Sequence, residues 1–255
     1  MKFYVCIKQV PDVNAPLQIK DGKLIQDEDR SILNAYDASA VEEALVIKET
    51  HDAEVEVVLA GPEKAKETIR KALAMGADKG THIITNNESE NDSYTYAKML
   101  AAFFKDKEYD YISCGKQSQD TDSGLTGGML AQLLEIPYVT NAVGLEFENN
   151  TLQVKRQGDA GQEMIELPSP GLVTCSNDMN DPRIPSLKGI MQSKRKPVDT
   201  IQAADLDIED EITPKTSVLG FEEKPGREPG QKFEGDPEEI AKKVAQLLDS
   251  EENLI

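Results

Sequence analysis

The stretch EVEVVLAGPEKAKETIRKALAMGADKGTHIIT, residues 54–85, decides the fold. Residues 54–60 predict a β-strand, and Gly61 and Pro62 open a helix that runs through Met75, with the proline in its first turn and Gly76 as its stop. Residues 81–85 predict the next strand. A strand, a helix and a second strand in this order require parallel strands joined by a right-handed crossover.

The same alternation extends outward on both sides. FYVCIKQ, residues 3–9, is the nearly continuous apolar run of a strand buried on both faces. Asp21 and Gly22 mark a hairpin turn, and Asp37 is the expected N-cap of the first helix. A helix at 94–104, a strand at 109–114 and a helix at 127–136 follow. We therefore predict an α/β fold with a mostly parallel, doubly wound sheet.

Beyond Pro137 the pattern changes to short alternating strands, at residues 143–147, 151–156 and 163–167, which predict antiparallel additions to the sheet. In VKRQGDAGQEMIELPSPGLVT, residues 154–174, a tight turn at 159–161 joins two strands. Pro170 then opens another strand at a position where no ladder N–H is needed.

The chain after residue 205 is acidic and rich in glycine and proline, which predicts an extended arm that does not fold alone. The arm ends in a helix that starts at Asp236 and Pro237. This helix carries an apolar stripe that needs a surface, either the chain's own body or a partner: Ile240, Val244, Leu247 and Leu248. We expect an α/β domain at residues 1–204 and the arm with its helix at 205–255.

Composition narrows the function classes. The net charge is −19, from 47 acidic and 28 basic residues, so binding to nucleic acid is not expected. No apolar run approaches the roughly 20 residues of a membrane span, and no signal or transit segment is evident, so we expect a cytoplasmic protein. His51 and His82 lack the spacing of metal ligands. Cys6, Cys114 and Cys175 are expected to be buried free thiols.

The strongest candidate site follows the strand at 109–114. In an open parallel sheet, ligands bind at the carboxyl ends of the strands. There GKQSQDTDSGLTGG, residues 115–128, offers glycines, hydroxyl groups and the start of a helix, which favour a phosphate. The spacing fits neither a P-loop nor a dinucleotide fingerprint, and a polar turn is the alternative. No acid–base pair or activated nucleophile is evident, so no catalytic residue is expected.

Several motifs in the same order resemble the small (beta) subunits of electron-transfer flavoproteins: NAYDASAVEEAL at 34–45, Gly61-Pro62, ETIRKALAMGAD at 67–78, the loop at 115–127 and the hairpin at 154–174. Ala160 departs from the family's usual glycine or acid, and Val13 replaces an aromatic residue that lies near the flavin in some members. The resemblance covers roughly residues 1–200. It implies a nucleotide-binding domain similar to adenine-nucleotide α-hydrolases, and a heterodimer with a large (alpha) subunit that holds most of the redox FAD.

By this resemblance the nucleotide is AMP with a structural role, or a second FAD that meets NADH in electron-bifurcating members. The Asp120 to Gly127 pattern favours AMP, whereas KQVPD at residues 8–12 occurs widely in bifurcating members. The implied nucleotide contacts are Cys6, Asn34, Ala35, Tyr36, Asp37, Ala60, Gly115, Lys116, Gln117, Ser118, Gln119, Asp120, Thr121, Asp122, Ser123, Gly124, Leu125 and Thr126.

DPRIPSLKGIMQSKRKPV, residues 181–198, is the second segment of interest, and we call it the basic segment. It resembles the family's recognition loop, in which a leucine, here Leu187, enters a pocket on a partner dehydrogenase of the acyl-CoA or a related type. Its basic residues are Arg183, Lys188, Lys194, Arg195 and Lys196. The expected function is that of an electron carrier subunit. A stand-alone adenine-nucleotide-binding enzyme or sensor is the alternative, although it needs neither the basic segment nor the arm.

Overall fold

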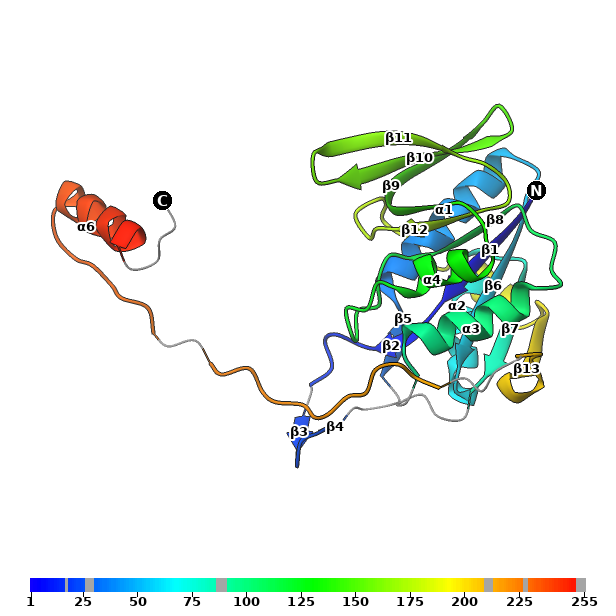
Figure 1. Ribbon diagram of the computed structural model, residues 1–255, viewed down its shortest axis with the longest axis horizontal. Helices are drawn as coiled ribbons and strands as arrows, with labels where there is room; N and C mark the ends of the chain where they lie inside the picture. The colour runs from blue at the N-terminus through cyan, green and yellow to red at the C-terminus, as the bar shows by residue number, and fades with distance from the viewer. Residues whose placement is uncertain (17, 26–29, 86–90, 209–212, 227–228, 251–255) are drawn as a thin grey trace. The chain divides into compact units, whose positions relative to one another are not determined.

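The computed structural model describes residues 1–16, 18–25, 30–85, 91–208, 213–226 and 229–250 (Figure 1). The chain divides into two compact units, residues 1–220 and 221–255. The first unit therefore includes residues beyond 204, the end of the predicted α/β domain. The acidic run at 209–212 lies outside the described residues, as do Leu17 and Gln26 beside the predicted hairpin.

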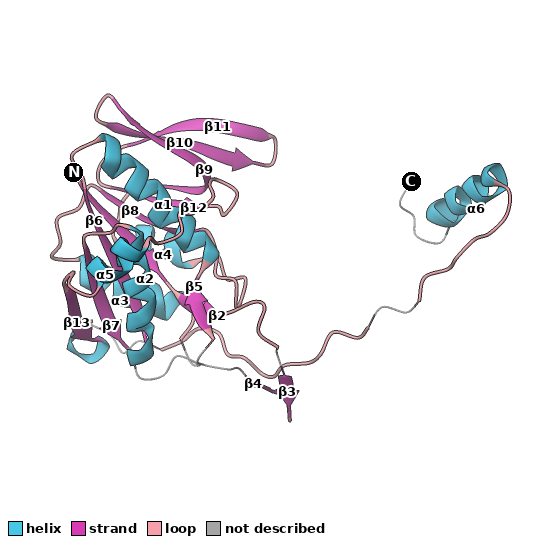
Figure 2. Ribbon diagram, turned by 180° about the vertical axis from the view of Figure 1, so that it is seen from behind, coloured by secondary structure: helices cyan, strands magenta, loops and turns pink. Residues whose placement is uncertain are grey.

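A large sheet forms the centre of the first unit (Figures 1 and 2). Among the described residues its strands lie in the order β11 (Gly161–Leu167), β10 (Thr151–Gly158), β9 (Tyr138–Glu148), β12 (Gly171–Cys175), β8 (Tyr111–Gly115), β1 (Lys2–Ile7), β6 (Glu54–Gly61), β7 (Lys79–Ile84) and β13 (Val198–Gln202). All neighbouring pairs from β9 to β13 are parallel. The predicted parallel, doubly wound sheet is confirmed.

Helices cover both faces of this sheet because successive strand residues point to opposite sides. Phe3 and Val5 of β1 belong to the apolar core beneath α1 (Ala35–Thr50) and α2 (Lys66–Met75). Tyr4 and Cys6 belong to the core beneath α3 (Ser93–Phe104) and α4 (Thr126–Leu133). The chain thus winds along one face of the sheet and then along the other.

The helix boundaries follow local chemistry, with two corrections. Pro62 precedes a short 3₁₀ turn, η1 (Glu63–Ala65), and α2 begins only at Lys66, so the proline lies before the helix and not in its first turn as predicted. The predicted stop is confirmed, since α2 ends at Met75 and is followed by Gly76, whose φ of 147° is unfavourable for other residues. The predicted N-cap at Asp37 is wrong, because α1 begins at Ala35 with Asn34 as its N-cap. Asp37 lies one turn further on and is buried.

The antiparallel additions are confirmed for β10 and β11, while β9 pairs antiparallel with β10 and parallel with β12. The Asp21–Gly22 turn is also confirmed: it joins β3 (Gln18–Lys20) to β4 (Lys23–Ile25), with positive φ at both turn residues. A second small pair consists of β2 (Gln9–Pro11) and β5 (Ser31–Leu33).

The basic segment is not wholly a loop. Ser186 accepts a hydrogen bond from the Gly189 N–H and caps the short helix α5 (Leu187–Ser193), after which β13 begins. In the second unit, α6 (Pro237–Ser250) starts where the sequence predicted, with Asp236 accepting from the N–H of Glu238. No helix in the described part of the chain is long and apolar enough to cross a membrane.

Candidate functional site

A cavity of about 440 Å³ lies at the carboxyl ends of β1, β6 and β8. The strand order changes direction here, since β6 lies on one side of β1 and β8 on the other. The starts of three helices meet at the same place: Asn34 before α1, Ser93 of α3 and Thr126 of α4 all line the cavity. Such a switch point is where open α/β sheets bind ligands.

The loop of residues 115–126, the glycine loop, is held by its own hydrogen bonds. The Ser118 N–H donates to the carbonyl of Ser123 at 3.1 Å, and the Asp122 N–H donates to the carbonyl of Ser118 at 2.9 Å. The hydroxyl groups of Ser118 and Thr121 lie 2.9 Å apart. The loop is therefore shaped before any ligand arrives, which lowers the entropic cost of binding.

Asn34 joins the glycine loop to the start of α1. Its amide nitrogen donates to the carbonyl of Gln117 at 2.9 Å, and its amide oxygen accepts from the Gln119 N–H at 3.1 Å. Gln119 returns the contact by accepting from the Ala35 N–H at 3.0 Å. This explains why Asn34 makes no side-chain cap bond to its own helix.

Asp37 ties together the ends of two strands. Its carboxylate accepts from the Lys8 N–H at 2.7 Å and from the Gly115 N–H at 2.8 Å. Burial raises the pKa of Asp37 to about 7, against the opposite effect of these two bonds. A Cβ at position 115 would lie 2.5 Å from the Asp37 carboxylate and 2.5 Å from the Tyr36 Cβ, so the backbone approaches closely enough to require glycine.

Lys8 was absent from the predicted site residues, although it lies near the end of the predicted strand at 3–9 and directly follows β1. Its ammonium group lies 2.7 Å from the Asp120 carboxylate and 3.5 Å from the Ser118 hydroxyl group. Asp120 therefore faces a lysine beside the cavity. The pair places the Lys8 ammonium group beside the glycine loop. The negative charge of Asp120 is matched by this lysine, so it does not repel an anion bound in the cavity.

The start of α4 supplies further donors. The first N–H groups of a helix have no helical carbonyl partner, and the helix dipole is positive there. Gly127 follows Thr126, and a Cβ on it would lie 2.8 Å from the Cys114 sulfur, so the helix start packs directly on β8. These donors, with Lys8, Lys116 and Lys215 on the wall, suit a phosphate group.

The structure brings most of the predicted nucleotide contacts into one cavity. The residues that line it are Cys6, Asn34, Asp37, Ala60, Gly115, Lys116, Gln117, Ser118, Thr121, Ser123, Gly124, Leu125 and Thr126. Five others are adjacent but do not line it: Ala35, Tyr36, Gln119, Asp120 and Asp122. Their side chains or backbone instead make the surrounding contacts, as Gln119 does with Ala35.

Sequence reasoning missed one wall of the cavity. Tyr94 and Tyr96 of α3 line it, as do Lys215, Thr216 and Val218 from the segment after β13. Residues 94 and 96 fell in a predicted helix, and residues 215–218 in a predicted arm. No local pattern connects either to the glycine loop, because they meet only through tertiary folding.

The three cysteines are buried free thiols, as predicted. Cys6 and Cys114 are register partners on β1 and β8, and both line the cavity. Burial raises the pKa of all three thiols, so they stay protonated and apolar in character.

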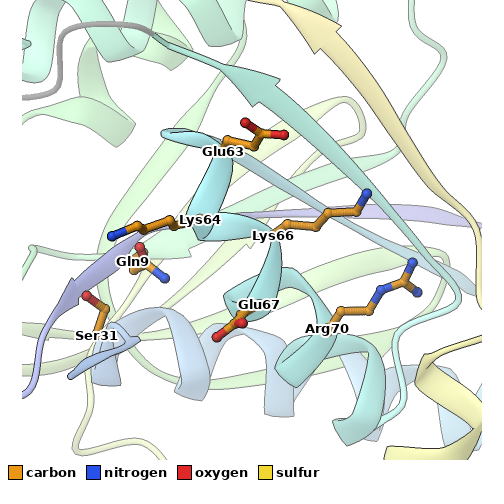
Figure 3. Close-up of a pocket in the computed structure, with 7 residues that line it drawn as sticks. All are labelled: Gln9, Ser31, Glu63, Lys64, Lys66, Glu67 and Arg70. Carbon is orange, nitrogen blue, oxygen red and sulfur yellow. The ribbon is translucent and has the colours of Figure 1, made fainter. Parts of the chain in front are cut away.

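A larger cavity of about 640 Å³ lies beside the start of α2, lined by Gln9, Ser31, Glu63, Lys64, Lys66, Glu67 and Arg70 (Figure 3). Both acidic and basic side chains line it. Arg70 donates to the carbonyl groups of Ser193 and Lys196, and Gln9 donates to the hydroxyl group of Thr68. Because Arg70 and Gln9 already bind to the chain itself and no residue of the glycine loop lines this cavity, size alone does not make it the ligand site.

The basic segment exposes apolar side chains while its charged ends are fastened to the body. Leu187 is 83% exposed and Ile184 is 92% exposed. Arg183, in contrast, donates from Nε and Nη2 to the Glu42 carboxylate at 2.8 and 2.9 Å. Lys196 donates to the carbonyl groups of Leu73 and Ala77. Arg183 and Lys196 thus have intramolecular partners, whereas Lys188, Lys194 and Arg195 are exposed.

Comparisons with known proteins agree on one family. The model of the electron transfer flavoprotein domain matches residues 21–206. The chain is 36% identical to the electron transfer flavoprotein subunit beta of Bacillus subtilis, over 100% of both chains. It is 35% identical to the same subunit of Mus musculus, over 95% of this chain and 96% of that one. Identity to the caffeyl-CoA reductase-Etf complex subunit CarD of Acetobacterium woodii is 38%, over 83% of this chain and 82% of that one.

These matches span the strands and helices that build the cavity, and the motifs quoted above lie within them. The chain therefore belongs to the electron transfer flavoprotein family as a beta subunit, and its role lies in electron transfer.

Proposed function

We propose that this chain is the small subunit of a heterodimer that carries electrons, with the redox FAD held mainly by a large (alpha) subunit. In this proposal the cavity at the carboxyl ends of β1, β6 and β8 holds AMP, which has a structural role. The observation that carries the proposal is the convergence of the glycine loop and three helix starts on this one cavity.

The residues present fit a nucleotide. The cavity volume of about 440 Å³ lies within the range of about 300–1,000 Å³ that is usual for small-molecule sites. The glycine loop and the N–H groups at the start of α4 would hold the phosphate, supported by Lys8 and Lys116. The apolar lining from Cys6, Ala60 and Leu100 suits the adenine ring.

A second FAD in the same cavity, together with NADH as electron donor, is the alternative. It is favoured by KQVPD at residues 8–12 and by the similarity to a subunit whose name places it in a caffeyl-CoA reductase-Etf complex. AMP is favoured by Thr126, which stands at the start of α4 where bifurcating relatives often carry an aliphatic residue.

We further propose that the basic segment docks the partner dehydrogenase, of the acyl-CoA or a related type. FAD supplies the electron-accepting chemistry when bound, and the residues of this chain bring the dehydrogenase to it. Leu187 and Ile184 offer exposed apolar side chains, and Lys188, Lys194 and Arg195 add exposed positive charge on the same segment. An apolar anchor inside a polar rim is how interface hot spots are commonly built.

One measurement tests the cofactor assignment. The native complex is purified, its small molecules are released with acid, and FAD and AMP are counted against protein. We expect equal amounts of FAD and AMP in each heterodimer. Two FAD molecules and no AMP would indicate the bifurcating form. A monomer that turns over ATP and holds no flavin would favour the stand-alone enzyme and overturn the proposal.

A further inference from the structure

One wall of the nucleotide cavity comes from residues 215–218, which we call the strap. Lys215, Thr216 and Val218 line the cavity together with residues from the strand ends. Neither the sequence motifs nor the similarity to known proteins assigns a function to this segment, and it lies beyond residues 21–206, the part that the family model matches.

The strap buries little of itself. Residues 215–218 are all exposed, and the side chain of Val218 is 67% exposed although it lines the cavity. Apolar packing therefore contributes little to holding the strap in place. The Lys215 ammonium group lies over the Tyr94 ring at 5.3 Å, an interaction worth only about 0.5–1 kcal/mol at an exposed position.

Among the described residues, the hydrogen bonds that the strap accepts or donates all go to one carboxylate. Oδ2 of Asp92 accepts from the N–H groups of Lys215 and Thr216 at 2.6 and 2.9 Å, and from the Thr216 hydroxyl group at 3.2 Å. Its other oxygen, Oδ1, accepts from the Thr95 N–H at 2.9 Å and caps α3. Burial raises the pKa of Asp92, but these N–H donors more than offset that effect, and the pKa lies below its ordinary value.

The two oxygens of Asp92 thus perform separate tasks. A helix cap needs one acceptor, which Asn or Ser provides as well as Asp. The second oxygen, with three donors directed at it, has no role in α3. Its contacts join positions 92 and 216, which are far apart in the chain and meet only at the cavity.

We propose that the strap closes the nucleotide site and that Asp92 is the positioning residue that holds it closed, so that Asp92 determines how fast the nucleotide leaves. The inference rests on the proposed function in one respect, namely that a nucleotide occupies this cavity. It adds a determinant of retention that lies outside the glycine loop.

Asp92→Asn provides the test, because it separates the two tasks. The remaining amide oxygen still caps α3, whereas the new NH₂ group faces three donors and cannot accept from them. Asp92→Ser is the second variant, since serine caps a helix equally well but does not reach the strap with a second oxygen. Asp236→Asn is the matched control: Asp236 also caps a helix, α6, by accepting from the Glu238 N–H, and it does not line the cavity.

The purified complex is saturated with AMP and passed through a desalting column, and the AMP that remains bound is measured by acid extraction over time. A hydrogen bond to a charged acceptor is worth about tenfold or more in an equilibrium constant. We therefore expect the Asp92→Asn and Asp92→Ser complexes to release AMP at least about tenfold faster, with unchanged melting temperature of the AMP-saturated complex and unchanged FAD content. Asp236→Asn should release AMP at the wild-type rate.

Release at the wild-type rate from both Asp92 variants would overturn the role of the strap and leave the proposed AMP site intact. Equally fast release from Asp236→Asn would show that the effect is not specific to Asp92, and it would also overturn the role of the strap. If the wild-type complex binds no nucleotide, the proposed nucleotide site is wrong, and the proposed role of the strap is wrong with it. Where the wild type holds a second FAD, the same assay follows the release of that FAD.

Discussion

Asp37 is the residue on which the geometry of the cavity most directly depends. Its carboxylate accepts the N–H groups of Lys8 and Gly115, which end the two strands on either side of the switch point. Without it, two partly buried N–H donors would lack a partner, at a cost of up to about 1–3 kcal/mol for each group. Burial simultaneously makes the charged form unfavourable and raises the pKa of Asp37 to about 7.

This raised pKa predicts a pH dependence of stability. An unfolded aspartate has a pKa of about 3.9, so the folded chain holds the proton more tightly than the unfolded chain. The stabilising contribution is fully present below about pH 4 and is lost as the pH rises through about 7. We expect Asp37→Asn to lack this component of the pH profile. Its loss of unfolding free energy relative to wild type should therefore be smallest at pH 8. Urea unfolding of both proteins at several pH values, with nucleotide content measured in parallel, tests it. Parallel profiles for the two would place the titration elsewhere.

Asp37 also illustrates what the sequence conceals at this scale. An aspartate before an apolar helical pattern predicts an N-cap, and the prediction failed by one turn because the carboxylate binds backbone groups of Lys8 and Gly115. Asn34, which is equally suited to capping, binds the glycine loop. Side chains of this kind satisfy whichever donors the tertiary fold brings near, and a local pattern carries no information on that choice.

Among the elements, α5 is the one whose exposed face predicts an interaction. Leu187→Ala should leave folding nearly unchanged, since the side chain is 83% exposed. Burying a leucine at a partner is worth about 1.5–3 kcal/mol, or roughly ten- to 150-fold in affinity. We expect flavin reduction by the dehydrogenase to require a correspondingly higher partner concentration, at an unchanged melting temperature. Leu133→Ala, on the exposed side of α4, is the control. The same concentration dependence for wild type and Leu187→Ala would exclude Leu187 from the interface.

The basic segment is also held at its start by α1. Glu42 accepts the N–H and the guanidinium of Arg183. Glu42→Gln replaces one acceptor with a donor that faces Arg183. Because the arginine is about one-third exposed, we expect a loss of about 1–3 kcal/mol in unfolding free energy.

Glu49→Gln is the control for this pair. Glu49 is an exposed partner of the same arginine, and such surface pairs contribute about 0–1 kcal/mol. Urea denaturation distinguishes the two variants, and the same pair is then compared in the dehydrogenase assay. A smaller loss for Glu42→Gln than for Glu49→Gln would contradict the assigned role of Glu42.

At the scale of the whole molecule, the order of strands and helices was predictable because periodicity is a local property. The run at residues 3–9, the Gly61–Pro62 helix start and the Gly76 stop each carry their own signal, and together they require the parallel sheet. The strap and the ion pair between Lys8 and Asp120 were not predictable, because each joins positions more than one hundred residues apart. The glycine loop could therefore be predicted from the sequence, whereas the other walls of the cavity become apparent only in the folded structure.

The second unit carries the last prediction. Ile240, Val244, Leu247 and Leu248 are only partly buried on α6, whose opposite face is charged. An apolar stripe of this kind is typical of a helix that packs on another surface, and we expect that surface to belong to the large subunit.

Val244→Asp and Leu247→Asp should each weaken the heterodimer at least about tenfold, as expected when a charge enters an apolar contact. The control is Gln246→Asp, which adds the same charge at an exposed position of the helix. Titration of the large subunit with each variant, followed by sedimentation, measures the affinity. If Val244→Asp and Leu247→Asp both bind like the wild type, the apolar stripe of α6 does not contact the large subunit, and the heterodimer forms through other surfaces of the chain.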